Sequence, residues 1–455
     1  MRNCHCEQVA GRNPARLDYE VTMISSADTF PNGSPSKKTM RSRWRFSWIL
    51  LVVLALSAPA RAETVTAASR LPSGLGVHVQ VWHTQPADLE RIKAFGFQFL
   101  RWGMSWEAIE KSPGEYDWSE PDAFFEKIRR AGLPSIVVLG TGNPLYGRWL
   151  QLPREPGVRE TRVAAPPESN AAMTAFSRFA AAAAKRYAYH PVTWEIWNEP
   201  DLPIFWPPRP HPDSYAQLVS LTCSAIKTAV PNATVLAPST AAQPISAPGF
   251  YRAIAESEAS GCLDGLSMHS YRMQGGKEPD PESVQADNVA SRALLERISP
   301  RWAAVPVLCT EWGYPSSVVG PKTQSAYLVR AYLANLASGV TATIWYEWKD
   351  SRDEVANPES HFGLQTNEGA FKTEPDQGLI HKLLAMRFIR RLESGNPLVQ
   401  ALLFDEGGSD HVVAWVRSDD PDLTVHAFMG GKPIVLSNSP TIWTGDRIEV
   451  SDNAR

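Results

Sequence analysis

The chain has 455 residues, which is enough for one large domain and a smaller one. Hydrophobic residues make up 43% of the chain, charged residues make up 20%, and the net charge is −3. This balance is ordinary for a folded soluble protein, and it gives no basic surface that would indicate a nucleic-acid partner. The 16 Trp residues stand out, because an indole ring suits both core packing and stacking on the flat apolar face of a ligand.

A short apolar segment near the N-terminus has the features of an export signal. Residues 46–56 are apolar, arginines precede them at 41, 43 and 45, and two small-residue cleavage patterns follow, Ala58-Pro59-Ala60 and Ala60-Arg61-Ala62. We therefore expect residues 40–62 to be a signal peptide of a periplasmic or secreted protein. The alternative is an uncleaved inner-membrane anchor, although 11 apolar residues fall short of the roughly 20 of a membrane-spanning helix. Residues 1–39 are polar, and we expect a structureless or mis-annotated leader ahead of a start at Met40.

Five Cys residues are present, and two of them, Cys4 and Cys6, precede the signal. Export would permit a disulfide in the mature protein, and Cys223 with Cys262 is one conceivable pair. We expect Cys309 to be buried and unreactive, with its side chain pointing into the interior of a barrel. The spacings match no metal-site pattern, so the sequence predicts no metal.

From about residue 74, short apolar runs alternate with helical stretches. The predicted strands are Gly76–Val81, Phe97–Arg101, Ser135–Leu139, Thr193–Trp197, Thr234–Ala237, Gly265–His269, Val307–Thr310 and Thr341–Trp345. The predicted helices include Asp122–Ala131, Asn170–Tyr187 with Asn170 as its N-cap, Ser214–Ala229 and Gln324–Ala337. Eight such repeats indicate an α/β fold, a (β/α)8 TIM barrel over residues 63–391. A doubly wound sheet is the alternative, but no Gly-rich phosphate loop favours it.

After residue 392 the helical pattern stops. Short strands are expected at Leu398–Phe404, His411–Val416, Leu423–Ala427, Pro433–Leu436 and Arg447–Val450, separated by turn residues. Residues 392–455 are therefore predicted to form a small C-terminal antiparallel β domain of the sandwich kind, which packs against the barrel.

Two glutamates carry the strongest chemical signal. Glu199 directly follows the fourth predicted strand, and Glu311 directly follows the seventh. Each lies next to Trp and a loop-forming Pro or Gly, at the strand ends where a barrel builds its active site. One such Glu would more often be structural, but two of them at one end of a barrel indicate a pair that acts together. A carboxyl pair supplies both a proton and a negative charge, which is what the cleavage of a glycosidic bond requires.

The motif Asn198-Glu199-Pro200, in register with Glu311, resembles the signature of clan A of the retaining glycoside hydrolases. The resemblance implies a (β/α)8 barrel with Glu199 as general acid/base and Glu311 as nucleophile. It also implies that Asn198 binds a sugar hydroxyl and that Arg101 keeps the nucleophile ionised. Three further substrate-site residues follow from it: His269 and Tyr271 after strand six, and Trp345 on strand eight as the floor of the sugar site.

Further segments narrow the resemblance to glycoside hydrolase family 39. They are residues 101–106 and 112–118 after strand two, together with residues 345–350 and 361–364. Within that family the likeness points to bacterial endoglycosidases of the biofilm exopolysaccharide Psl. The segment Lys372-Thr373-Glu374-Pro375 departs from the Lys-Pro-Ala-Tyr of the relatives, and it is expected to border the site.

Other residues are weaker candidates for contact with a sugar. His78 on the first strand and Asn143 after the third are placed to reach the site, and Trp312, Trp348 and Trp206 lie in loops that are expected to line a cleft. Glu195, on the same strand as Glu199, is expected to pair with a buried Arg rather than to react, because a charge deep in a barrel needs a partner.

The sequence therefore predicts a retaining glycoside hydrolase that needs no cofactor. Its partner would be a polysaccharide or oligosaccharide, it would act as a monomer, and its cleavage would be endo. Two alternatives stay open: an exo-acting β-xylosidase-like enzyme, and a non-catalytic glycan-binding barrel of an envelope complex.

Overall fold

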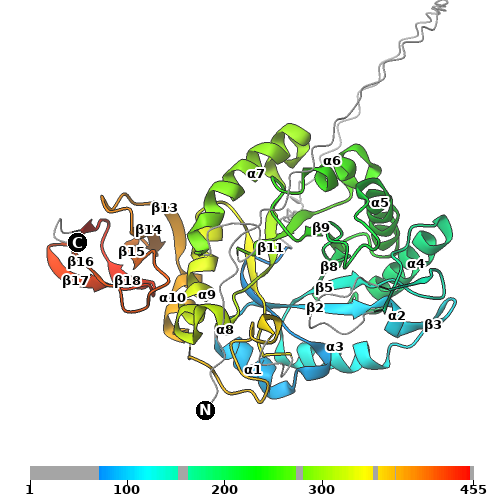
Figure 1. Ribbon diagram of the computed structural model, residues 1–455, viewed down its shortest axis with the longest axis horizontal. Helices are drawn as coiled ribbons and strands as arrows, with labels where there is room; N and C mark the ends of the chain where they lie inside the picture. The colour runs from blue at the N-terminus through cyan, green and yellow to red at the C-terminus, as the bar shows by residue number, and fades with distance from the viewer. Residues whose placement is uncertain (1–70, 152–161, 273–279, 352–356, 375, 451–455) are drawn as a thin grey trace, which may run out of the picture. The chain divides into compact units, whose positions relative to one another are not determined.

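The computed structural model describes residues 71–151, 162–272, 280–351, 357–374 and 376–450 (Figure 1). The described residues all belong to one compact unit. The predicted leader and export signal, residues 1–62, lie outside the described residues. None of the helices in the described part of the chain has the length and apolar character needed to cross a membrane.

Eight parallel strands close into a barrel in the order β1-β12-β11-β10-β9-β8-β5-β2. They are β1 (Gly74–His78), β2 (Phe99–Ser105), β5 (Ser135–Gly140), β8 (Val192–Ile196), β9 (Thr234–Thr240), β10 (Gly265–His269), β11 (Val307–Trp312) and β12 (Ala342–Trp345). All eight overlap the predicted strands, and the closed sheet confirms the (β/α)8 barrel and excludes the doubly wound alternative.

Helices surround the barrel (Figure 1). They are α1 (Pro86–Ala94), α2 (Trp106–Ile109), α3 (Ser119–Ala131), α4 (Asn170–Arg186), α5 (Pro212–Ala229), α6 (Pro248–Glu256), α7 (Val284–Ile298), α8 (Ser316–Val319), α9 (Pro321–Leu336) and α10 (Gln377–Ala385). Short 3-10 helices lie at Val81–His83, Glu258–Gly261, Pro281–Ser283, Pro300–Ala304 and Pro358–Ser360, and two small hairpins pair β3 (Glu110–Ser112) with β4 (Glu115–Tyr116) and β6 (Trp149–Gln151) with β7 (Arg162–Ala164).

Helix α4 begins at Asn170 as predicted, but its N-cap is the residue before it. Its N-cap is Ser169, whose hydroxyl accepts a hydrogen bond from the Ala172 amide at 3.1 Å, and Asn170 is the first helical residue. Both residue types cap helices well, so the side chain that reaches the free amides of the first turn decides which of them does so.

The barrel contains two different interiors. One end is filled by a compact apolar cluster: Leu71, Phe99, Ile136, Leu236, Leu308, Ala342 and Ile344. Toward the other end, where the strands finish, buried polar side chains such as Arg101 and Glu195 replace the apolar ones. A larger apolar core fills the space between the barrel and the helices. The apolar end stabilises the barrel, and the polar end is available for chemistry.

The small β domain begins earlier than predicted. Strand β13 (Arg387–Arg391) belongs to the four-stranded sheet β13-β14-β15-β18, so the first β residue is Arg387 rather than residue 392. The other strands of that sheet are β14 (Val399–Glu406), β15 (Ser409–Val416) and β18 (Thr441–Thr444), of which the sequence did not predict β18; the second sheet holds β16 (Val425–Met429), β17 (Lys432–Leu436) and β19 (Glu449–Val450).

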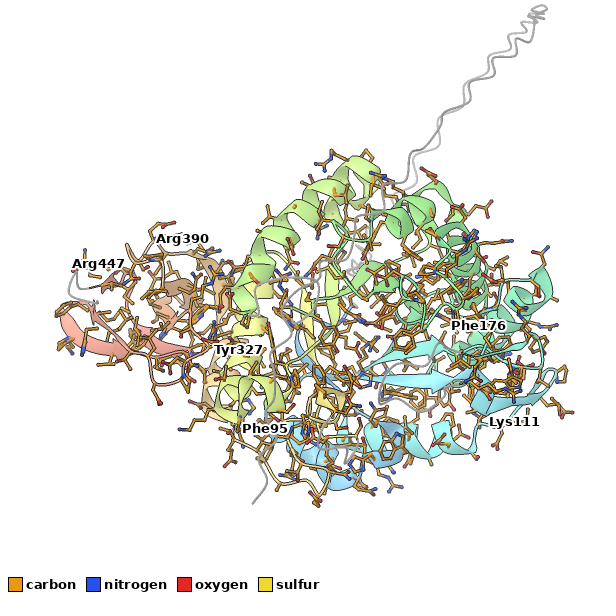
Figure 2. All side chains as sticks on the ribbon, viewed as in Figure 1. Phe95, Lys111, Phe176, Tyr327, Arg390 and Arg447 are labelled. Atoms are coloured by element: carbon orange, nitrogen blue, oxygen red, sulfur yellow. A yellow bond between two sulfur atoms is a disulfide. The ribbon has the colours of Figure 1, made fainter. Side chains whose placement is uncertain are left out.

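Buried charges join this domain to the barrel. Arg330 of α9 pairs with Glu282 at 2.7 Å and donates to the Ser418 carbonyl at 2.6 Å. Trp415 Nε1 donates to Glu282 at 2.7 Å, and Tyr327 lies on the side of the barrel that faces the domain (Figure 2). The charges of Arg330 and Glu282 compensate each other, and the contacts with Ser418 and Trp415 extend this pair into the β domain. The barrel and the β domain accordingly belong to one compact unit.

A disulfide joins Cys223 of α5 to Cys262, which follows the 3-10 helix Glu258–Gly261. The bond closes a segment of the chain in which the two cysteines are 39 positions apart. Cross-linking such a segment lowers the entropy of the unfolded chain, so the folded state gains stability relative to it.

We predict that the variant Cys223→Ser/Cys262→Ser will lose about 2–4 kcal/mol of unfolding free energy relative to the oxidised protein. Urea unfolding with and without a reductant measures the difference, because reduction should destabilise only proteins that keep the disulfide. Cys309→Ser is the matched control: it should still respond to reductant. Equal midpoints for the oxidised and reduced wild type would contradict the stabilising role.

Candidate active site

The carboxyl ends of five barrel strands bring polar side chains together. Arg101 comes from β2, His269 is the last residue of β10, Glu311 lies on β11, and Glu199 follows β8. His78 ends β1. All five side chains belong to residues with at most 8% of their surface exposed. The structure therefore joins residues that are up to 233 positions apart in the sequence, 311 minus 78, in one buried group.

Arg101 connects this group. Its Nε donates to Glu195 at 2.8 Å, its Nη1 donates to Glu311 at 3.1 Å, and its Nη2 donates to Asn198 Oδ1 at 2.8 Å. The predicted partner of Glu195, a buried Arg, is thus Arg101. The guanidinium is 1% exposed, and the two carboxylates outweigh the cost of its burial and raise its pKa above the ordinary value.

Glu311 is held in its charged form. Burial by itself would raise the pKa of this carboxyl, but the nearby charges of His269 and Arg101 outweigh burial and lower the pKa to about 2. His78 lies 4.0 Å from the same carboxylate, and burial followed by the charge of Arg101 lowers the pKa of its imidazole to about 3. Glu311 is therefore a carboxylate with a neutral His and a fixed cation beside it.

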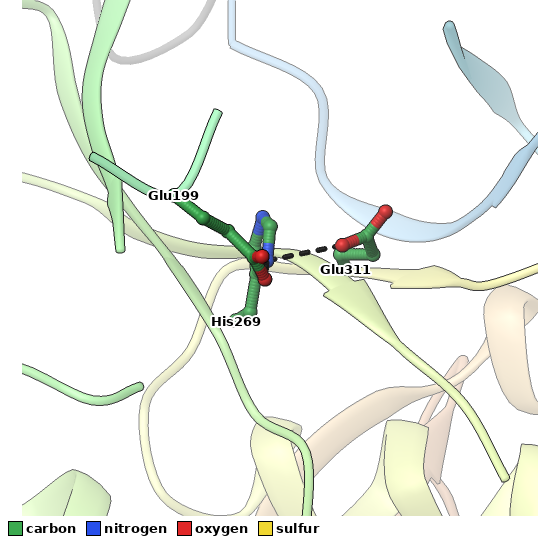
Figure 3. Close-up of side chains that lie close together, drawn as sticks. All are labelled: Glu199, His269 and Glu311. Carbon is green, nitrogen blue, oxygen red and sulfur yellow. Dashed lines mark hydrogen bonds and ion pairs between the residues drawn. The ribbon is translucent and has the colours of Figure 1, made fainter. Parts of the chain in front are cut away.

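His269 bridges the two glutamates (Figure 3). Its Nδ1 lies 2.6 Å from Glu199 Oε1 and 3.0 Å from Glu311 Oε2, while its Nε2 lies 3.1 Å from Ser239 Oγ. Burial opposes the charged imidazole, but Glu311 and Glu199 outweigh it and raise the pKa of His269 to about 9. The imidazole is therefore doubly protonated and positively charged at neutral pH, and it lies between the two carboxyl groups that can accept its Nδ1 proton.

Glu199 and Glu311 also approach each other. One carboxylate oxygen of each and one His269 nitrogen all lie within 4.8 Å of one another. Such spacing among two carboxylates and an imidazole would suit a metal ion. Arg101, however, already places a fixed positive charge 3.1 Å from Glu311, which would repel a divalent cation from the same carboxylate.

The backbone around Glu199 is strained. Trp197 has φ = +69° and Glu199 has φ = +46°, values that cost a non-Gly residue roughly 1–2 kcal/mol each. Two contacts hold this geometry: the Glu199 amide donates to the Ser239 carbonyl at 2.9 Å, and the Tyr215 hydroxyl donates to the Ile196 carbonyl at 2.7 Å. The turn aims the Glu199 side chain at His269 instead of continuing the strand.

β-Bulges change the direction of side chains near the site. The pairing of β10 with β11 shifts between Met268 and His269, and that of β11 with β12 shifts between Cys309 and Trp312. Cys309 therefore does not share a face with Glu311, which corrects the expectation that it points into the barrel. It packs in the core between barrel and helices, and burial raises the pKa of its thiol to about 11, as expected for an unreactive thiol.

Trp345 is not the floor of the site, contrary to the prediction. It is fully buried 6.4 Å from the Tyr314 ring, because the inward-facing residues of β12 are Ala342 and Ile344. The next residue of that parity is Tyr346, whose ring lies 5.0 Å from His78. Gly313 permits the Tyr346 backbone to pass close by, since a Cβ at position 313 would lie 1.9 Å from the Tyr346 carbonyl oxygen.

The three loop tryptophans predicted to line a cleft are core residues. Trp206 is fully buried against Tyr215 and donates to Glu168, Trp312 is fully buried near Tyr314, and Trp348 is 2% exposed. A large aromatic side chain gains stability when it is buried against other aromatic rings, even if its backbone lies in a loop. The cleft-lining role expected for them is therefore corrected to a packing role.

Asn143 is also a structural residue. Its amide nitrogen donates to the carbonyls of Trp106 and Glu110, and its Oδ1 accepts from the Leu145 amide at 2.9 Å. With its polar atoms used in this loop, Asn143 does not face a ligand, and the predicted contact is corrected.

Asn198 and Tyr271 lie beside the charged group. Asn198 is bound to Arg101 beside Glu199, and the Tyr271 ring lies 6.3 Å from His269. Lys372, from the segment that departs from the relatives, pairs with Asp350 at 2.8 Å and donates to the Ser316 hydroxyl at 3.0 Å, so it ties the connection after β12 to the start of α8. Pro375 of that segment lies outside the described residues.

The sequence did not predict a third carboxyl next to the site. Glu347 follows Tyr346, its Oε2 accepts from Gln80 Nε2 at 2.9 Å, and burial raises its pKa to about 7. Ser239 belongs to none of the segments that carried the resemblance. Glu347 lies in one of them, residues 345–350, and its position just beyond the eighth strand was the signal that could have placed it at the site.

We predict that His269 makes stability depend on pH. Because folding raises its pKa from 6.5 to about 9, its contribution is fully present below pH 6.5 and is lost as the pH rises to 9. The wild type should lose on the order of 3 kcal/mol more than His269→Asn across that range. Urea unfolding at a series of pH values measures this, with His426→Asn of the β domain as the control. Parallel curves for wild type and His269→Asn would contradict the charged imidazole.

Comparison with known proteins shows the fold. No family model matches the chain, and no curated protein matches it by sequence. Among solved structures it is similar to a family 39 glycoside hydrolase from Bacteroides cellulosilyticus WH2, with a TM-score of 0.63 and 20% identity over 83% of this chain and 82% of the other. A monomeric β-xylosidase from Caulobacter crescentus CB15 gives 0.59 and 20% over 78% of each chain. A family 30 endoxylanase from Clostridium papyrosolvens C71 gives 0.53 and 15% over 82% and 93%. The chain thus shares its (β/α)8 barrel with these proteins.

Proposed function

We propose that this protein is a retaining glycoside hydrolase of the family 39 kind, with Glu311 as nucleophile and Glu199 as general acid/base. The observation that carries the proposal is that one imidazole nitrogen, His269 Nδ1, lies 2.6 Å from Glu199 and 3.0 Å from Glu311, so that one oxygen of each carboxylate lies within 4.8 Å of the other. In retaining enzymes the carboxyl groups are about 5–5.5 Å apart, whereas inverting enzymes need about 6.5–9.5 Å to admit a water between them.

The charges around the pair suit a double displacement. Arg101 and His269 keep Glu311 ionised, so that it can attack the anomeric carbon. Glu199 passes a proton to the departing oxygen, and the protonated His269, whose Nδ1 lies 2.6 Å from Glu199 Oε1, supplies that proton to Glu199 and becomes neutral. In the second step Glu199 takes a proton from water and returns it to His269, and the water displaces the sugar from Glu311 with net retention.

The substrate class and the mode of action are the finer part of the proposal. We propose endo cleavage of a polysaccharide, with a bacterial exopolysaccharide such as Psl as the candidate suggested by the sequence resemblance. The main alternative, an exo-acting β-xylosidase-like enzyme, is supported by the structural likeness to a protein described as a monomeric β-xylosidase. All residues of the charged network come from one chain, which supports action as a monomer.

We further propose that the protein is exported to the periplasm or beyond, either free or held at the inner membrane by residues 46–56. The Cys223–Cys262 disulfide supports export, because such bonds persist in oxidising compartments and are rare in the bacterial cytosol.

We predict that Glu199→Gln and Glu311→Gln will each lower turnover of a glycan substrate about 10³-fold or more with the fold intact. Azide should partly restore Glu199→Ala on an aryl glycoside with a good leaving group, because that substrate needs no acid in its first step. Glu256→Gln, on the surface of α6, is the control, and circular dichroism checks folding. Unchanged hydrolysis by both Gln variants would show that the glutamates do no chemistry, whereas a wild type that binds glycans without hydrolysing any of them would establish the non-catalytic glycan-binding barrel.

We predict that digestion of a glycan panel, including exopolysaccharides, will yield oligosaccharides with an early fall in viscosity. Endo cleavage cuts long chains in half long before it releases much sugar, whereas exo cleavage releases single sugars at nearly constant viscosity. Mass spectrometry of the products and NMR of the first anomer formed provide the measurement. Monosaccharide as the first product from every glycan would establish the β-xylosidase-like alternative, and an inverted anomer would contradict the double displacement.

A further inference from the structure

Exposed apolar side chains gather at one end of the barrel. In the part of the chain that the structure describes, 15 large hydrophobic side chains are exposed. Seven of them lie in the connections that follow barrel strands at the active-site end, some of them in short helices or strands within those connections: Trp82, Leu145, Trp149, Ile204, Phe205, Ile245 and Val318. At the opposite end of the barrel, the described connections that lead into barrel strands carry one such exposed residue, Tyr189, between α4 and β8. An uneven distribution of this kind marks a binding surface, because bare apolar area is costly in water.

Trp82 is the most exposed indole of the seven residues, with 61% of its surface accessible. It lies in the 3-10 helix Val81–His83, only four residues after His78, which is 4.0 Å from Glu311. The segment between them is fixed: the Trp348 amide donates to the His78 carbonyl at 3.0 Å, and Gln80 binds Glu347. The indole is thus presented on an ordered turn at the edge of the candidate active site.

The barrel order sets the side on which this ring lies. Glu199 follows β8, so the leaving part of a substrate extends over the β8 loop, where Phe205 is 39% exposed. Strand β1 is separated from β8 by β2 and β5 on one side and by four strands on the other, and it pairs with β12 next to Tyr346. Trp82 therefore lies on the side of the site opposite to the leaving group.

We propose that Trp82 is a stacking platform for a distal sugar on the non-reducing side of the cleaved bond. This inference rests on the proposed glycosidase function and deepens it, since it makes the substrate a chain with at least one sugar beyond the one that reacts. The face of a pyranose ring presents several C–H groups, and an exposed indole face offers them an apolar surface at little entropic cost. A substrate consisting of a single sugar would leave Trp82 uncovered.

A pair of chromogenic substrates with the same leaving group tests the platform. The 4-nitrophenyl β-glycosides of one sugar and of the corresponding linear trisaccharide, in the xylo, gluco and manno series, differ only on the non-reducing side. Wild type should prefer the trisaccharide by about tenfold or more in kcat/KM, and Trp82→Ala should lose most of that preference. Trp82→Phe should restore part of it, and Tyr189→Ala should leave both rates as in wild type.

The outcomes separate the inference from the proposed function. Hydrolysis by wild type supports the glycosidase, and a preference that Trp82→Ala keeps in full overturns the platform alone, as does a wild type without any preference. Trisaccharide binding to Glu311→Gln, followed by intrinsic fluorescence, needs no turnover: an additional Trp82→Ala should weaken Kd about tenfold, and an unchanged Kd would overturn the platform. If no series is hydrolysed but the trisaccharide binds through Trp82, the platform stands and the glycosidase proposal fails.

Discussion

The site depends on one buried cation. Arg101 is 1% exposed, and it has to be compensated on every side, because a guanidinium without partners would destabilise the barrel by several kcal/mol. Glu195 compensates it from deeper in the barrel, and Glu311 does so from the rim, at 2.8 and 3.1 Å. The same interaction that makes burial tolerable therefore keeps Glu311 ionised. Nη2 of the same guanidinium also donates to Asn198, the residue before Glu199. The Arg101 side chain therefore positions both members of the acid pair.

A second constraint lies in the backbone. A regular strand would send alternate side chains inward and would not bring Glu199, His269 and Glu311 to one point. The positive φ angles at Trp197 and Glu199, and the register shifts on β10 and β11, change those directions locally. The surrounding packing has to hold such irregular backbone, and the fully buried rings of Trp206 and Trp312 provide it. Several aromatic residues near the site thus stabilise the geometry of the acid pair without facing a ligand.

The protonated His269 gives the pair its asymmetry. Its Nδ1 is closer to Glu199, at 2.6 Å, than to Glu311, at 3.0 Å, while Arg101 contacts Glu311 and not Glu199. Fixed positive charge thus accumulates at one carboxylate, and an exchangeable proton lies beside the other. This is the division that a nucleophile and a general acid require, and it arises from which strand each neighbour occupies.

The sequence by itself determined the repeat of eight strands and helices, the position of both glutamates at strand ends, and the need of Glu195 for a cationic partner. These follow from local pattern, because strand ends, periodicity and buried charge leave a trace in neighbouring residues. Only the tertiary structure decided which aromatic side chains face the site. Trp345 and Tyr346 are adjacent and chemically alike, and the inward parity of β12 places Tyr346 rather than Trp345 next to His78. The burial of Asn143, the outward turn of Cys309 and the contact of Gln80 with Glu347 likewise depend on bulges and on partners distant in the sequence, which no local pattern records.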